Sequence, residues 1–134
     1  MIIIGIGVDI VDNTRIKNSI KNKNFISRIF STKEIDQSKK IKDKTSYYSK
    51  RFAAKESLSK AIGTGISKGL NFKDISILND KNGKPYYNLS NKAKKVIYSK
   101  FKIKKFKIYL SLADEKNYSI AFSVIHKWLV KTLY

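Results

Sequence analysis

The chain has 134 residues, no cysteine and a formal net charge of +19 at pH 7. This size fits one domain over residues 1–134, and the missing thiols exclude disulfide scaffolds, thiolate catalysis and zinc–thiolate sites. The lysine excess favours a polyanionic or acidic partner, although lysine, isoleucine and asparagine also share AT-rich codons. No apolar run is long enough to span a bilayer and the apolar N-terminus lacks a basic leader, so we expect a cytoplasmic protein.

Hydrophobic periodicity and flanking caps predict a buried strand and three helices in the first half of the chain, over residues 2–11, 13–20, 32–40 and 45–62. Asp12 can cap the first helix, and Ser31 with Glu34 fits a capping box. Gly63 can end the longest helix.

The second half begins with a hairpin signal, "NDKNGKP", centred on Asn82-Gly83. Ser90 caps a lysine-rich helix that ends near Phe101, and two strands follow over about 106–112 and 118–125. Non-adjacent strands and clustered helices predict an α+β fold with a mainly antiparallel sheet.

The first strand contains "GIGVD" at residues 5–9. A dinucleotide-binding loop is excluded, because no third glycine follows and the strand continues instead of opening a helix. The glycines instead allow a ligand or another backbone to approach. Asp9 projects from this apolar strand, which is costly unless the carboxylate is paired or binds a cation. A ligand role is favoured over a salt bridge to a lysine.

The longest helix carries "RFAAKESLSKAIGTG" at 51–65, where Glu56 and Lys60 have the spacing of a surface ion pair. An alternative is that Asp9 and Glu56 share a magnesium ion, completed by phosphate oxygens and water. Lys55 and Lys60 would then neutralise the same phosphates. The chain has arginine only at 15, 28 and 51, and these are candidates for bidentate contacts to anions.

Four segments, "GIGVDIVDNTRI", "FISRIFSTKE", "RFAAKESLSKAIGTG" and "NGKP", occur in the order and spacing of the holo-[acyl-carrier-protein] synthases, the small bacterial 4′-phosphopantetheinyl transferases. The resemblance covers residues 4 to about 125. It implies magnesium-dependent transfer of 4′-phosphopantetheine from coenzyme A to a serine of apo acyl carrier protein in fatty-acid biosynthesis. It also implies a homotrimer with sites between subunits.

The resemblance places Asp9 and Glu56 on the family's magnesium-binding acids, and Lys60 near the transferred phosphate; these three are the expected catalytic residues. The residues expected to bind coenzyme A are Arg51, Lys55, Ser59, Gly63, Thr64, Lys84 and Pro85. The residues expected to dock the carrier protein are Arg15, Lys17, Lys21 and Arg28.

One departure from the family pattern lies in "SLADEKNY", where Ala113 and Asp114 stand in place of a Ser/Thr and a His. We expect Asp114 to be neither a metal ligand nor required for the chemistry. The alternatives are a coenzyme A-binding homologue without turnover and a small basic nucleic-acid-binding protein, which the charge alone would support. If the chain is an enzyme of this family, as the resemblance implies, we expect neither a nucleic acid nor a membrane as a partner.

Overall fold

The computed structural model describes residues 1–67 and 69–128. Its elements, in chain order, are β1 (Ile2–Asp12), α1 (Asn13–Ser19), α2 (Lys23–Ile29), α3 (Thr32–Ser38), α4 (Lys44–Ile62), the 3-10 turn η1 (Phe72–Asp74), β2 (Ile75–Asn79), β3 (Pro85–Leu89), α5 (Asn91–Phe101), β4 (Phe106–Asp114) and β5 (Tyr118–Lys127).

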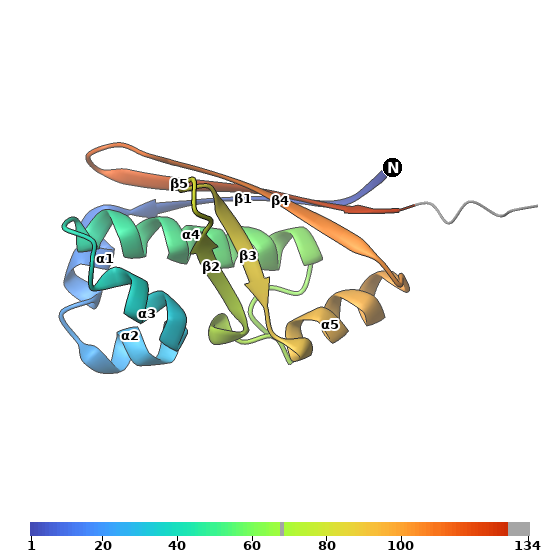
Figure 1. The fold of residues 1–134 in the computed structure, drawn as a ribbon, viewed down its shortest axis with the longest axis horizontal. Helices are drawn as coiled ribbons and strands as arrows, with labels where there is room; N and C mark the ends of the chain where they lie inside the picture. The colour runs from blue at the N-terminus through green and yellow to red at the C-terminus, as the bar shows by residue number, and fades with distance from the viewer. Residues whose placement is uncertain (68, 129–134) are drawn as a thin grey trace, which may run out of the picture.

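The fold is α+β, as the sequence predicts, and every strand pair is antiparallel. One sheet has the order β1-β5-β4, and β2 pairs with β3 in a separate hairpin. Figure 1 shows α4 lying along one face of the larger sheet, with α2, α3, the hairpin and α5 on the other side of α4. The prediction of one domain over 1–134 stays a prediction.

The predicted helix ends are confirmed where the signal is local. Asp12 accepts a hydrogen bond from the Thr14 amide, Ser31 and Glu34 form a capping box, and Gly63 ends α4 with a positive φ of 88°. The predicted hairpin is also confirmed. β2 pairs with β3 across a loop over residues 80–84, in which Gly83 has a positive φ of 84°.

The prediction that the first strand is buried is wrong for one of its two faces. Side chains on the face away from α4 are largely exposed: Ile6 63%, Val8 54% and Ile10 60%. Ile120 and Phe122 of β5, which pair with Ile10 and Val8, are also exposed on this face. The larger sheet therefore carries an uncovered apolar surface, which we call the outer sheet face.

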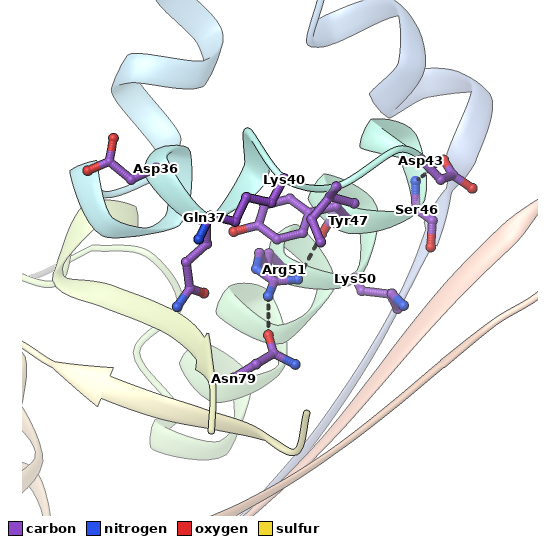
Figure 2. Close-up of a pocket in the computed structure, with 10 residues that line it drawn as sticks. Asp36, Gln37, Lys40, Asp43, Ser46, Tyr47, Lys50, Arg51 and Asn79 are labelled. Carbon is purple, nitrogen blue, oxygen red and sulfur yellow. Dashed lines mark hydrogen bonds between the residues drawn. The ribbon is translucent and has the colours of Figure 1, made fainter. Parts of the chain in front are cut away.

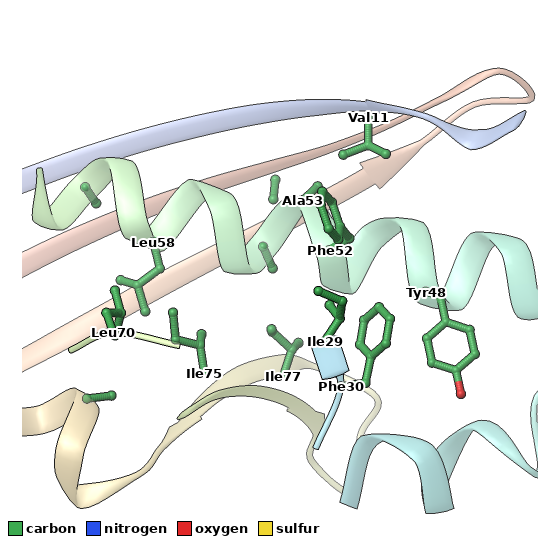
Figure 3. Close-up of a cluster of buried hydrophobic side chains, with 14 of the residues drawn as sticks. Val11, Ile29, Phe30, Tyr48, Phe52, Ala53, Leu58, Leu70, Ile75 and Ile77 are labelled. Carbon is green, nitrogen blue, oxygen red and sulfur yellow. The ribbon is translucent and has the colours of Figure 1, made fainter. Parts of the chain in front are cut away.

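Helix α4 runs through the middle of the hydrophobic core. Leu58 and Ala53 are fully buried, and Figure 3 shows them between Val11 of β1 on one side and Ile75 and Ile77 of β2 on the other. Both sides of α4 are therefore covered.

Two glycines allow α4 to contact the backbone of β1 directly. A Cβ atom at Gly5 would lie 2.2 Å from the carbonyl oxygen of Ala61, and one at Gly7 would lie 1.9 Å from that of Ser57. Real Cβ atoms do not approach this closely, so any side chain there would push the helix away. Of the two sequence-based explanations for these glycines, approach of another backbone is the one observed.

Gly7→Ala should lower the free energy of unfolding by about 3 kcal/mol or more, because the clash involves helix backbone that cannot move alone. Urea unfolding followed by circular dichroism measures this. The matched control is Gly83→Ala, where φ is 84° and no atom lies within 4 Å of an added Cβ; backbone strain should cost about 1–2 kcal/mol there. Equal losses in both variants would contradict the close approach.

Candidate active site

Asp9, Glu56 and Lys60, which we call the acid–lysine cluster, lie where α4 crosses β1. Lys60 Nζ is 2.9 Å from Asp9 Oδ1 and donates a second hydrogen bond to the carbonyl oxygen of Val8 at 3.1 Å. The expected Glu56–Lys60 surface pair is therefore replaced by an ion pair between helix and strand. The Asp9 side chain is only 14% exposed, whereas that of Lys60 is 54% exposed.

Glu56 belongs to the same electrostatic environment. Burial raises the pKa of its carboxyl above the usual range, and the nearby charge of Asp9 raises it further, while Lys60 and Arg15 act in the opposite direction. Within the described part of the chain, no hydrogen bond or ion pair engages the Glu56 carboxylate. The two acids thus repel one another, and one of them has no partner.

This arrangement fits a magnesium ion. Mg²⁺ prefers oxygen ligands, keeps several waters and is commonly held by one or two carboxylates together with substrate phosphates. Asp9 and Glu56 supply two carboxylates from two rigid elements, and a cation between them would relieve their repulsion. Residues 1–67 and 69–128 contain no group of three or more acidic or histidine side chains, so water and substrate would complete the coordination.

Arg51 lies at a separate cavity of about 650 Å³, which we call the Arg51 hollow. Figure 2 shows its side chains converging from α3, α4 and the end of β2. The residues that line this cavity include Lys40, Ser46, Tyr47, Lys50, Arg51 and Asn79. Lys50, Tyr47 and Asn79 were not among the site residues predicted from the sequence. The only signal was the spacing of four residues between Tyr47 and Arg51, which places both on the same face of a helix.

Arg51 is a buried cation, only 4% exposed. Its guanidinium carbon lies 3.5 Å from the centre of the Tyr47 ring, Nη1 donates to the Tyr47 carbonyl oxygen at 3.4 Å, and Nη2 donates to Asn79 Oδ1. Burial lowers the pKa of this group. Its Nε has no partner, and no carboxylate pairs with it, among the described residues. A buried cation without a counter-ion beside an open cavity suits a phosphate group.

The acid–lysine cluster and the Arg51 hollow face opposite directions. Arg51 and Lys60 are nine positions apart on α4, which is two and a half turns of an α-helix. Lys60 contacts β1, whereas Arg51 contacts β2 through Asn79. One chain therefore cannot place both groups in a single pocket.

The other expected coenzyme A residues divide between these two sites. Asn79 of the Arg51 hollow pairs with Pro85 in the hairpin and donates from Nδ2 to the Gly83 carbonyl oxygen at 2.8 Å. Lys84 is exposed in the same turn, so Lys84 and Pro85 lie beside the Arg51 hollow.

Gly63 and Thr64 directly follow the last turn of α4, at the same end of the helix as Lys60. Gly63 is exposed and Thr64 is half-buried, so both are accessible. Ser59 is not: its side chain is buried, and Oγ donates to the Glu56 carbonyl oxygen at 2.7 Å. The expected hydrogen bond from Ser59 to a ligand is absent from the geometry, because its hydroxyl is already used within the helix.

The expectation that Lys55 contacts phosphate is contradicted. Its side chain is fully buried, and Nζ lies 2.6 Å from Glu34 Oε1 in an ion pair that is also fully buried. The same ammonium donates to the carbonyl oxygens of Phe72 and Ile75. All three of its donors are occupied, so Lys55 holds α4 to α3 and β2 and does not reach the acid–lysine cluster.

The four expected docking residues are all exposed on α1, α2 and the loop between them. Arg15 also borders the site, because its charge acts on Glu56 and its guanidinium carbon lies 5.7 Å from the centre of the Phe52 ring. Lys17, Lys21 and Arg28 make no ion pair within the described residues.

Asp114 joins the end of β4 to the start of α4. Its Oδ2 accepts a hydrogen bond from Ser46 Oγ at 2.6 Å, and its Oδ1 lies 3.8 Å from Lys50 Nζ. Both partners line the Arg51 hollow. Asp114 is thus near the edge of the Arg51 hollow and contacts its cationic wall, away from Asp9.

Comparison with known proteins identifies the family. The sequence profile of the 4′-phosphopantetheinyl transferase superfamily matches residues 5–123. The holo-[acyl-carrier-protein] synthase of Pelagibacter ubique (strain HTCC1062) is 57% identical over 127 residues, which is 95% of this chain and 99% of that relative. The chain belongs to the holo-[acyl-carrier-protein] synthase family of 4′-phosphopantetheinyl transferases.

Solved structures of the family share the fold. The holo-[acyl-carrier-protein] synthase of Neisseria meningitidis superposes with a TM-score of 0.83 at 34% identity, covering 94% of this chain and all of that one. The Helicobacter pylori enzyme, solved in complex with coenzyme A, has a TM-score of 0.74 at 33% identity, covering 90% of this chain and 99% of that one. The family resemblance expected from the four sequence segments is confirmed, and with it the enzyme class.

Glu56→Gln should stabilise the metal-free protein. Because the folded state raises the pKa of Glu56, the ionised form opposes folding, and this penalty grows as pH rises through and above the ordinary carboxyl range. Removing the charge should raise Tm by roughly 1–3 °C at pH 7.5, and the difference should vanish in acid. Differential scanning calorimetry in chelator tests this, with exposed Glu115→Gln as the control. A lower Tm for Glu56→Gln would contradict the repulsion.

Proposed function

We propose that this enzyme transfers 4′-phosphopantetheine from coenzyme A to a serine of apo acyl carrier protein, in a magnesium-dependent reaction of fatty-acid biosynthesis. The observation that carries the proposal is the meeting of Asp9, from β1, and Glu56, from α4, beside Lys60. Family membership and the coenzyme A complex of the Helicobacter pylori relative support it. The cytoplasmic location and the lack of nucleic-acid and membrane partners stay predictions. No helix within residues 1–67 and 69–128 is long and apolar enough to cross a membrane.

In this reaction the serine oxygen bonds to the phosphorus that carries pantetheine, and the bridge of the diphosphate breaks to release 3′,5′-ADP. Such transfers depend mainly on positioning and charge neutralisation. A magnesium ion held by Asp9 and Glu56 would polarise the diphosphate. Lys60 and Arg15 place two further positive charges beside the same acids. No histidine or cysteine nucleophile is needed.

The Arg51 hollow is suited to the nucleotide end of coenzyme A. Three cations, Arg51, Lys40 and Lys50, line this cavity against two acids, Asp36 and Asp43. Lys84 and Pro85 lie beside it. A phosphate there would supply the counter-ion that Arg51 lacks within the described chain.

Because the two sites face opposite directions on α4, we propose that the complete site forms between subunits of a homotrimer. The outer sheet face offers a surface for association, since Ile6, Val8 and Ile10 are more than half exposed in the single chain. In a closed ring, the acid–lysine cluster of one subunit would meet the Arg51 hollow of its neighbour.

Conversion of apo acyl carrier protein, followed by intact-mass spectrometry with coenzyme A and Mg²⁺, tests the function. We expect one phosphopantetheine per carrier protein, and a fall in rate of roughly 100-fold or more in Asp9→Asn, since several kcal/mol of charge stabilisation is lost. Coenzyme A binding without any conversion would identify a homologue without turnover, and no binding at all would contradict the proposal.

Complementation tests the position of the site. Asp9→Asn disables the acid–lysine cluster and Arg51→Gln disables the Arg51 hollow, so each variant alone should be nearly inactive. Co-expression in equal amounts should recover about a quarter of the wild-type sites. Each mixed trimer pairs an intact cluster with an intact hollow at one of its three interfaces, and about three quarters of randomly assembled trimers are mixed. Size-exclusion chromatography checks that each variant assembles. Mixed trimers no more active than the separate variants would place the whole site within one chain.

We also propose that Arg15, Lys17, Lys21 and Arg28 attract the acidic carrier protein. Attraction between exposed charges is screened over about 10 Å at 0.1 M salt. Raising the salt concentration should therefore increase the KM for carrier protein much more than that for coenzyme A. Lys21→Glu, which lies outside the acid–lysine cluster, should do the same at low salt. Steady-state kinetics measures both, and equal salt sensitivity for the two substrates, with an unchanged carrier-protein KM in Lys21→Glu, would contradict this docking surface.

A further inference from the structure

The ammonium of Lys60 holds one oxygen of the Asp9 carboxylate, which is one of the two acids proposed to bind the metal ion. Both of its hydrogen bonds go to β1, one to Asp9 Oδ1 and one to the Val8 carbonyl oxygen. Asp9 is largely covered, with 14% of its side chain exposed, whereas more than half of the Lys60 side chain is in contact with solvent. Lys60 therefore closes the cluster from the solvent side.

A divalent cation shared by Asp9 and Glu56 would lie close to the ammonium of Lys60. Nζ is 2.9 Å from Asp9 Oδ1, and a metal ion at coordination distance from the same carboxylate would repel it strongly. Lys60 can leave, because more than half of its side chain is exposed and water can hydrate the released ammonium. Its four-carbon stem also lets the ammonium swing away without movement of α4.

We propose that Lys60 is an exchangeable counter-ion of Asp9. Without metal, its ammonium neutralises the carboxylate; when Asp9 and Glu56 bind a divalent cation, Lys60 leaves Asp9 and becomes available to the phosphates of the substrate. This inference rests on the metal site of the proposed function. It assigns to Lys60 a second state, in which it competes with the metal, in addition to its expected contact with phosphate.

The competing explanation is that Lys60 permanently fastens α4 to β1. The hydrogen bond to the Val8 carbonyl oxygen is compatible with that role. The two explanations predict opposite changes in metal affinity when Lys60 is removed. A permanent fastener should help to hold Asp9 and Glu56 in place, so that its removal weakens metal binding. A competitor should do the opposite.

Titration calorimetry with Mn²⁺ and with Mg²⁺, in the absence of coenzyme A, separates these explanations. We expect Lys60→Met to bind either ion roughly three- to tenfold more tightly than the wild type, because the variant loses a counter-ion that must be displaced. The matched control is Lys95→Met, which removes the same charge from an exposed position of α5 and should bind as the wild type does. Unchanged or weaker binding by Lys60→Met would overturn the exchange alone. A wild type that binds neither ion, even after coenzyme A is added, would overturn the metal site of the proposed function, and the exchange with it.

A second measurement follows the ammonium itself. Acetylation of the wild-type protein by a limiting reagent, mapped by mass spectrometry, reports the reactivity of each lysine. Lys60 should react severalfold faster with Mg²⁺ than in chelator, because leaving Asp9 frees its nitrogen, while Lys95 should not change. Equal rates for Lys60 in both conditions, in protein shown by calorimetry to hold the metal, would overturn the exchange.

Discussion

The contact of α4 with the backbone of β1 is the constraint on which the site depends. At Gly5 and Gly7 no side chain separates the two elements, and the carbonyl oxygens of Ala61 and Ser57 occupy the space that a Cβ would need. Ser57 Oγ also donates to the Gly7 carbonyl oxygen at 2.9 Å. Because strand and helix are both rigid and touch directly, the separation of Asp9 from the next turn of α4 is set by backbone geometry. Two acids that repel one another can be held together in this way, whereas flexible side chains alone would let them move apart.

The interior position of α4 explains why its charged residues have such different roles. A charge on a buried helix needs a partner, and Lys55 finds one in Glu34, whose other oxygen accepts the Ile77 amide at 3.2 Å. Arg51 has only the neutral Asn79 and the Tyr47 ring, so it remains suited to an external anion. The two sides of α4 thus contact different elements, β1 on one side and β2 on the other. The same packing that makes α4 stable separates the two sides that we propose to bind anions, which is why the proposed site would need a second subunit.

The sequence predicts those features whose causes are local. The caps at Asp12 and Ser31 and the end of α4 at Gly63 depend on residues within a few positions of one another, and all three are observed. The roles of Lys55 and Ser59 could not be predicted in this way. Glu34 is 21 positions from Lys55, and no periodicity in "RFAAKESLSKAIGTG" shows that β2 and β1 cover opposite sides of the same helix. Tertiary packing can bury polar residues of a helix when their partners come from distant elements, and the sequence of the helix alone does not show those partners.

The balance of charge at the acid–lysine cluster contrasts with that of the whole chain. The protein has a net charge of +19, yet Asp9 and Glu56 are balanced by Lys60 and Arg15, the two cations that act on Glu56. A strongly positive site would repel a divalent cation, and a strongly negative one would repel a diphosphate. A balanced site can receive both in order, because a bound divalent cation gives it the positive charge that the diphosphate then neutralises. The lysines elsewhere act at longer range, where they raise the local concentration of any anionic substrate without distinguishing one from another. On the proposed function, selectivity for a diphosphate therefore arises from a few charges held by the contact of α4 with β1, and the large net charge contributes to the rate of encounter.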